Sequence, residues 1–154
     1  MEFNKAGLED VSQLVNMRMM YINENFGEIS ETQKATIETE LPKYFSRHLG
    51  KDMMAFVAKD EGEIIATAMF VVIEKPANPR FVTGKIGEVL SVYTCPKYRR
   101  QGIAKQVMTQ LLSYAKEQQI DLVELKATKD GYPLYKQLGF EEEKSANVSM
   151  KYTI

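Results

Sequence analysis

The sequence contains one cysteine, one histidine and no tryptophan. A single cysteine cannot form a disulfide within the chain, and this suits a reducing compartment. No cluster of cysteines and histidines has the spacing of metal ligands, so we expect no metal. The first residues lack the apolar core of a signal peptide, and no apolar run approaches the roughly 18 residues of a membrane span. We therefore expect a cytoplasmic protein.

The chain also lacks an excess of charge of either sign. Twenty Lys and Arg residues oppose 21 Asp and Glu residues, which gives a net charge of −1 and a pI near 5.9. No overall basic field is available to attract nucleic acid or an anionic membrane, so neither is an expected partner. The length of 154 residues corresponds to about one domain of roughly 150 residues, and we expect a single domain over 1–154.

What the sequence does contain is a mixture of helical and extended patterns. Apolar residues recur at helical spacing in some segments, whereas others alternate or form short apolar runs bounded by turn residues. Helices are predicted at 9–26, 30–48, 103–118 and 133–138, with Pro42 kinking or splitting the second. Strands are predicted at 2–7, 53–58, 64–73, 85–94, 122–127 and 148–152. The fold class is therefore mixed α/β (α+β).

One segment carries a recognisable binding chemistry. The strand Lys85–Thr94 is ended by Pro96, and Arg99–Ala104 then leads directly into a helix. Free backbone N–H groups at a helix N-terminus, aided by the helix dipole, form an anion site suited to a pyrophosphate. Gly102 lacks a Cβ and lets phosphate oxygens approach the backbone. The local basic residues are Lys97, Arg99, Arg100 and Lys105.

The residues Val92–Ala104, VYTCPKYRRQGIA, are followed by Leu134–Phe140, LYKQLGF. In order and separation these segments resemble the two signatures of the GNAT superfamily of acyl-CoA-dependent N-acyltransferases, and the resemblance covers about Ile86–Phe140. It implies a mixed, mostly antiparallel central sheet of about six to seven strands, flanked by about four helices. The sheet would splay after its fourth strand and admit the pantetheine arm of acetyl-CoA. The implied reaction is direct acetyl transfer from acetyl-CoA to an amine, without a metal.

The resemblance also implies roles for residues in the first signature. Main-chain groups of Val92, Tyr93 and Thr94 would pair with pantetheine, and the Val92 N–H would polarise the thioester carbonyl. The 3′-phosphate would meet Lys105 and Lys97, although a solvated lysine is the alternative. The backbone N–H groups that would hold the pyrophosphate belong to Arg99, Arg100, Gln101, Gly102, Ile103 and Ala104.

Further roles fall between and after these segments. Tyr135 matches the family tyrosine that protonates the departing thiolate, and its reference pKa near 10 keeps it protonated at neutral pH; simple packing is the alternative. Glu88 matches the strand glutamate that serves as base in histone-type members, with a salt-bridged or exposed glutamate as the alternative. The alternation of a strand predicts that Glu88 and Val92 share one face. Many relatives carry Asn and Ala where this chain has Thr128 and Gly131, and Thr128 could still bond pantetheine.

Several questions stay open at the level of sequence. Cys95 could serve as an acyl nucleophile, but no histidine lies near it and a small buried hydrophobic role fits better. An acceptor site is expected near the first two helices, where a small cationic amine, an amino acid, a peptide or an antibiotic amine would all fit. The residues of that region are Arg18, Tyr21, Glu24, Phe26 and Glu28.

The other function classes are a non-catalytic acetyl-CoA sensor and a protein-interaction or nucleic-acid module. Retention of both Glu88 and Tyr135 argues against a sensor, and the acidic pI argues against nucleic acid. A protein-lysine or N-terminal acetyltransferase remains an alternative within the same chemistry. A homodimer, formed through sheet edges or C-terminal strands, is compatible with the sequence.

Overall fold

A computed structural model describes all residues from 1 to 154. Five strands form one sheet in sequence order, and four α-helices and two short 3-10 turns surround it. The strands are β1 (Glu2–Lys5), β2 (Met53–Asp60), β3 (Glu63–Glu74), β4 (Lys85–Thr94) and β5 (Leu122–Glu124). The helices are α1 (Val11–Asn25), α2 (Glu31–His48), α3 (Ile103–Glu117) and α4 (Tyr132–Leu138), with turns η1 (Leu8–Asp10) and η2 (Pro96–Tyr98).

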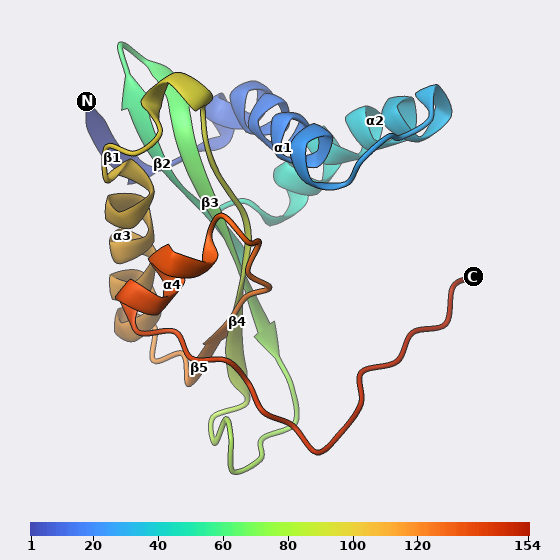
Figure 1. The fold of residues 1–154 in the computed structure, drawn as a ribbon, viewed down its shortest axis with the longest axis vertical. Helices are drawn as coiled ribbons and strands as arrows, with labels where there is room; N and C mark the ends of the chain where they lie inside the picture. Colours follow the sequence, from blue (N-terminus) through green and yellow to red (C-terminus); the bar gives the residue numbers. More distant parts are fainter.

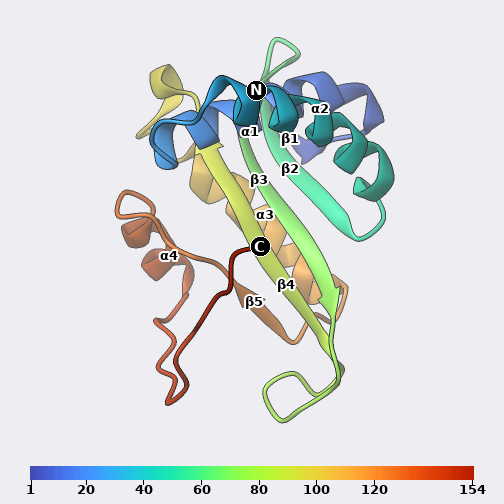
Figure 2. The same ribbon diagram turned by 90° about the vertical axis from the view of Figure 1, so that its right-hand side faces the viewer.

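The sheet separates two helical layers. Helices α1 and α2 lie on one face, and α3 and α4 lie on the other (Figures 1 and 2). Each layer covers its own apolar cluster, which contains Leu14 and Phe45 on the first side and Val107 and Leu111 on the second. Strand β3 contributes to both clusters and is buried on both faces, as its nearly unbroken apolar run predicts.

Local signals explain the second helix well. The Ser30 hydroxyl accepts a hydrogen bond from the Gln33 N–H at 3.1 Å, and the Gln33 side chain accepts one from the Ser30 N–H at 3.0 Å. This reciprocal cap satisfies donors that the first turn leaves free. Pro42 is predicted to kink or split this helix; α2 continues through Pro42 as one element, so the split does not occur. None of the helices combines the length and apolar character needed to cross a membrane.

The sheet opens between β4 and β5. The first three strand pairs are antiparallel, whereas β5 runs parallel to β4 and pairs with it only from Ile86 to Glu88. Strand β4 continues to Thr94, so its last residues have no strand on that side. The predicted splay after the fourth strand is therefore present. Strand β5 ends at Glu124 rather than at Ala127, because the chain leaves β4 there.

The C-terminal segment departs from the prediction of a sixth or seventh strand. Residues Val148–Tyr152 belong to no strand, because they pair with no other part of the chain. An alternating pattern makes a segment competent to form a strand, but a ladder also needs a partner with free N–H and C=O groups. Figure 1 shows the end of the chain after α4 running away from the sheet, toward the side on which α1 and α2 lie. We call Ser145–Ile154 the C-terminal arm.

Candidate active site

The loop between β4 and α3 presents a row of free backbone donors. The N–H groups from Arg100 to Lys105 have no acceptor within the chain, whereas the Arg99 N–H already donates to the Pro96 carbonyl at 3.2 Å. The free donors therefore begin at Arg100 rather than at Arg99. Arg100 and Gly102 have left-handed φ angles of 63° and 78°. Successive N–H groups around left-handed residues form concave anion sites, which the dipole of α3 reinforces.

The side chain of Arg99 has a structural role instead. Its guanidinium pairs with Glu24 of α1 through two contacts of 2.9 Å and donates to the Thr94 carbonyl at 2.8 Å. It also lies over the Tyr93 ring, 5.2 Å from the centroid. The hydrogen bonds that Arg99 donates to Glu24 raise the pKa of Arg99. The pair fixes the anion-binding loop to α1 and removes both charges from the set available to a ligand.

Strand β4 contains a bulge beside this loop. Leu90 pairs with Met69 and Tyr93 pairs with Thr67, so between these two pairs β4 has two residues opposite a single residue of β3. The extra residue is Ser91, which has a φ of 53° and a buried hydroxyl with no hydrogen-bond partner. A bulge of this kind bends the strand and re-aims the side chains that follow it.

The bulge overturns the predicted relation between Glu88 and Val92. Val92 packs against the α3 cluster, whereas Glu88 is paired with Val71, which packs against the α1 and α2 cluster. The expectation that they share a face is wrong, because the extra residue Ser91 interrupts the alternation of β4. Glu88 instead lies within electrostatic range of Tyr44 on α2 and, after burial and Asp52, contributes to the raised pKa of Tyr44.

Tyr135 lies on the opposite helical layer, in the cluster that α3 covers. Its side chain is 7% exposed and packs edge-on against Phe140, with ring centroids 5.9 Å apart. Burial, with a smaller effect of Tyr21 on α1, raises the pKa of Tyr135 to about 12. Tyr135 on α4 is therefore within electrostatic range of Tyr21 on α1. The phenol is thus protonated at neutral pH, as a proton donor must be.

Two residues of the α4 approach explain how Tyr135 is held. A Cβ at Gly131 would lie 2.8 Å from the Tyr135 ring, so glycine permits the close approach of the ring. The Thr128 hydroxyl accepts a hydrogen bond from the Gly131 N–H at 3.1 Å. Thr128 therefore shapes the turn before α4 and does not lie in a strand.

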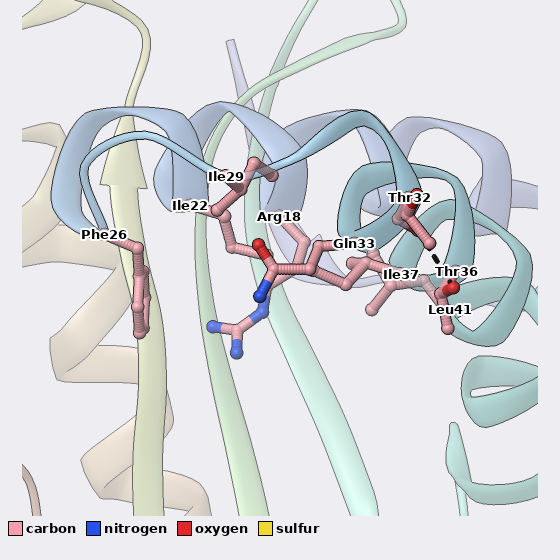
Figure 3. Close-up of a pocket in the computed structure, with 9 residues that line it drawn as sticks. All are labelled: Arg18, Ile22, Phe26, Ile29, Thr32, Gln33, Thr36, Ile37 and Leu41. Atoms are coloured by element: carbon pink, nitrogen blue, oxygen red, sulfur yellow. Dashed lines mark hydrogen bonds between the residues drawn. The ribbon is translucent and has the colours of Figure 1, made fainter.

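A pocket of about 620 Å³ lies between α1 and α2 (Figure 3). Its lining consists of Arg18, Ile22, Phe26, Ile29, Thr32, Gln33, Thr36, Ile37 and Leu41. Two residues of the expected acceptor region, Arg18 and Phe26, line this pocket. Glu24 does not line it and is paired with Arg99. The arrangement therefore contains an apolar pocket with one cation, close to the face that carries Glu88.

Other chemistries find little support. The Cys95 thiol is half-buried, and its sulfur lies 4.0 Å from that of Met17. Burial raises the pKa of Cys95 and keeps it a thiol, which favours the packing role over a nucleophile. No group of three or more His, Cys, Asp or Glu side chains is placed to hold a metal ion.

Sequence reasoning missed two features of this region. Tyr44 looks like any aromatic residue of an amphipathic helix, and no local signal relates it to Glu88. The bulge had one sign, the polar Ser91 within the apolar strand Lys85–Thr94. A lone serine is too common in strands to identify a bulge.

Comparisons with known proteins agree with this geometry. Residues 17–140 match the family model described as the Acetyltransferase (GNAT) family. An uncharacterized N-acetyltransferase of Archaeoglobus fulgidus is 26% identical over 133 residues, covering 86% of this chain and 85% of that protein. A predicted acetyltransferase of Clostridium acetobutylicum, solved with acetyl-CoA, is 30% identical with a TM-score of 0.86, covering 97% and 95% of the two chains. A GCN5-related N-acetyltransferase of Ralstonia eutropha JMP134 shares the fold at 23% identity, with a TM-score of 0.82 and 97% coverage of both chains.

Proposed function

The chain belongs to the GNAT family of acetyl-CoA-dependent acetyltransferases, and from this premise we propose that it transfers the acetyl group directly to a primary amine within a ternary complex. The observation that carries the proposal is the row of free N–H groups from Arg100 to Lys105, beside the unpaired end of β4. We assign the activity to residues 1–154 as one catalytic domain acting in the cytoplasm, where acetyl-CoA is available and a lone cysteine stays reduced.

Acetyl-CoA would be held mainly by backbone groups. The free N–H groups that begin at Arg100 are suited to the pyrophosphate, and Lys97 and Lys105 are suited to the 3′-phosphate. Pantetheine amides would pair with main-chain groups of Val92–Thr94 as an added strand. The N–H of Val92 would then polarise the thioester carbonyl where negative charge develops.

Transfer needs one base and one acid. A neutral amine attacks the thioester carbon, and its proton passes to the Glu88 carboxylate directly or through water. The C–S bond breaks as the tetrahedral intermediate collapses, and Tyr135 donates its proton to the departing thiolate. Glu88 lies on the face of the sheet that α1 and α2 cover, and Tyr135 lies on the face that α3 and α4 cover, so the two groups would approach the thioester from opposite sides.

Thiol release from acetyl-CoA, measured at mildly alkaline pH against pooled amines, tests the proposed function. The pools hold amino acids, polyamines, aminoglycosides and short peptides, and a blank contains no acceptor. Release above the blank in one pool establishes transfer and identifies the acceptor class. If the protein binds acetyl-CoA but releases no thiol in any pool, the proposal is contradicted for these acceptor classes. That result would favour a non-catalytic acetyl-CoA sensor.

Substitution of Glu88 tests the base. We expect Glu88→Gln to lower kcat by about 100-fold and to change the acid side of the pH–rate profile, because the amide cannot accept the amine proton. Glu63→Gln, at the exposed start of β3, is the matched control and should keep the kcat and the pH–rate profile of the wild type. A Glu88→Gln profile identical to that of the wild type would exclude Glu88 from the mechanism.

We also propose that two copies associate through the C-terminal arm. Its apolar side chains alternate along an extended segment, and each is more than four-fifths exposed: Val148, Met150, Tyr152 and Ile154. Alternation of this kind is typical of a strand with one covered face. The arm reaches away from its own sheet (Figure 1), and the outer edge of β5 in a second copy, which pairs with no strand, offers it a ladder.

Light scattering of the eluting protein tests the assembly. We expect the mass of a dimer of the 17.6 kDa chain, and a shift to monomer for Met150→Asp, because a charge on the covered face is costly to bury. Ser149→Asp, on the other face of the arm, should leave the dimer intact. A wild-type monomer at every concentration would contradict the proposal.

A further inference from the structure

Arg18 is the only charged residue in the lining of the pocket between α1 and α2. It forms no ion pair, and its side chain makes no hydrogen bond within the chain. Its one charge contact is with the face of the Tyr21 ring, whose centroid lies 5.5 Å from the guanidinium carbon. In Figure 3 its guanidinium points from α1 into the space beneath the α1–α2 connection, beside Gln33. Arg99, the arginine that contacts α1 from the loop before α3, is engaged by Glu24. Arg18 is therefore the available cation of this pocket.

The environment of Arg18 is unfavourable for an unpaired charge. Burial lowers the pKa of Arg18, and neighbouring Tyr21 and Tyr44 only partly oppose this effect. A guanidinium remains charged under all working conditions, so it cannot relieve the cost by losing its proton. The Tyr21 ring offers no hydrogen-bond acceptor in its face, so an anion in the pocket would supply the charged, hydrogen-bonding partner that the chain does not.

The sheet face that α1 and α2 cover also carries the opposite charge, because Glu88 is paired with Val71, which packs against the cluster on that face. The pKa of Tyr44 responds to both Arg18 and Glu88, which act in opposite directions. Tyr44 is therefore within electrostatic range of a cation and of the carboxylate that we assign as base. One face thus offers an anion site at Arg18 and an amine site at Glu88. Such a pair complements a molecule that carries an amine and an acid group.

The rest of the lining indicates what joins these groups. Five of the nine lining residues are apolar, and one guanidinium matches a single negative charge better than a dianionic phosphate. We propose that the acceptor is an apolar amino acid, with its carboxylate bound by Arg18 and its amine directed toward Glu88. The inference rests on the proposed function and replaces the cationic amine that Glu24 had suggested, because Glu24 is neutralised by Arg99.

Matched acceptors that differ only in the carboxylate test the proposal. The pairs are L-leucine with isopentylamine and L-phenylalanine with phenethylamine. Because the carboxylate also lowers the pKa of the amine, the informative quantity is the change in the ratio of kcat/KM values when Arg18 is substituted. We expect Arg18→Gln to lower the acid-to-amine ratio by about 10- to 100-fold, the value of a charge-assisted hydrogen bond.

Three further measurements separate this role from a structural one. The KM for acetyl-CoA should be the same in Arg18→Gln as in the wild type. Arg18→Lys should recover part of the acid-to-amine ratio of kcat/KM. Arg47→Gln, on the exposed side of α2, should behave as wild type. An equal loss for both members of each pair would overturn the proposal. Failure of every amino acid to react in an enzyme that acetylates other amines would overturn it too.

A binding experiment distinguishes failure of this inference from failure of the proposed function. Calorimetry of N-acetyl-L-leucine, the expected product, needs no turnover. Binding to the wild type that is lost in Arg18→Gln, in a chain without transferase activity, would support the carboxylate site and contradict the transferase. If the enzyme acetylates amines but does not bind N-acetyl-L-leucine, or if the wild type and Arg18→Gln bind it equally, the carboxylate site at Arg18 is overturned and the transferase function is not.

Discussion

The Tyr135→Phe enzyme is expected to lose about 100-fold of kcat while it folds and binds acetyl-CoA normally. A positioned general acid contributes about 10²- to 10⁴-fold, and a thiolate, with a conjugate acid of pKa about 8.5, is a good enough leaving group to place the loss near the lower end. The ring packs against Phe140 and Gly131, and the phenylalanine ring would keep these contacts. Initial rates at saturating substrates measure the loss.

The matched control for this substitution is Tyr132→Phe. Tyr132 begins the same helix but is 39% exposed, so removal of its hydroxyl should leave kcat unchanged. Thermal unfolding of both variants checks that packing is retained. Wild-type turnover in a folded Tyr135→Phe enzyme would show that another group, or water, protonates the thiolate.

The raised pKa of Tyr135, about 12, determines how activity depends on alkaline pH. The protonated phenol is the active form, so Tyr135 should cause no fall in kcat near pH 10, where an ordinary tyrosine titrates. The same displacement means that the folded state holds this proton more tightly than the unfolded chain. Its contribution to stability is complete below about pH 10 and declines as pH rises toward 12.

The parts of the site that depend on neighbouring residues could be predicted from the sequence. The cap of α2 needs only Ser30 and Gln33, three residues apart. The anion-binding loop depends on a strand, a proline, a glycine and a helix in direct succession, so its place before α3 followed from the order of residues. The resemblance to the GNAT signatures added the roles of Tyr135 and Glu88, which periodicity alone does not assign.

The parts that depend on distant residues could not be predicted. Arg99 and Glu24 are 75 positions apart, and from the sequence each of them is assigned to a ligand. Their pairing is decided by the packing of α1 beside β4, which no local pattern indicates. The register of β3 on β4 creates the bulge at Ser91, and this register depends on the packing of both sheet faces. The fate of the C-terminal arm depends on what it meets outside its own chain.

Gly102→Val is expected to raise the KM for acetyl-CoA by about 100-fold with a smaller effect on kcat. Gly102 has a φ of 78°, a conformation that is a genuine outlier for a β-branched residue. A Cβ added at Gly102 meets no atom within 4 Å, so the substitution acts mainly through the backbone. The loop would relax to a negative φ and turn N–H groups away from the pyrophosphate. Loss of one or two charge-assisted hydrogen bonds, each worth about 1.5–3 kcal/mol, accounts for the expected change.

Gly62→Val separates backbone strain from loss of the anion site. Gly62 lies in the turn between β2 and β3 with a φ of 83° and no atom within 4 Å of an added Cβ, so the two substitutions impose comparable strain on the chain. Both variants should unfold at a lower temperature, but only Gly102→Val should require more acetyl-CoA. Gly102→Asn should lie between wild type and valine, because asparagine tolerates left-handed backbone. Equal increases in KM for Gly62→Val and Gly102→Val would mean that acetyl-CoA responds to general stability, and the backbone donors would lose their assigned role.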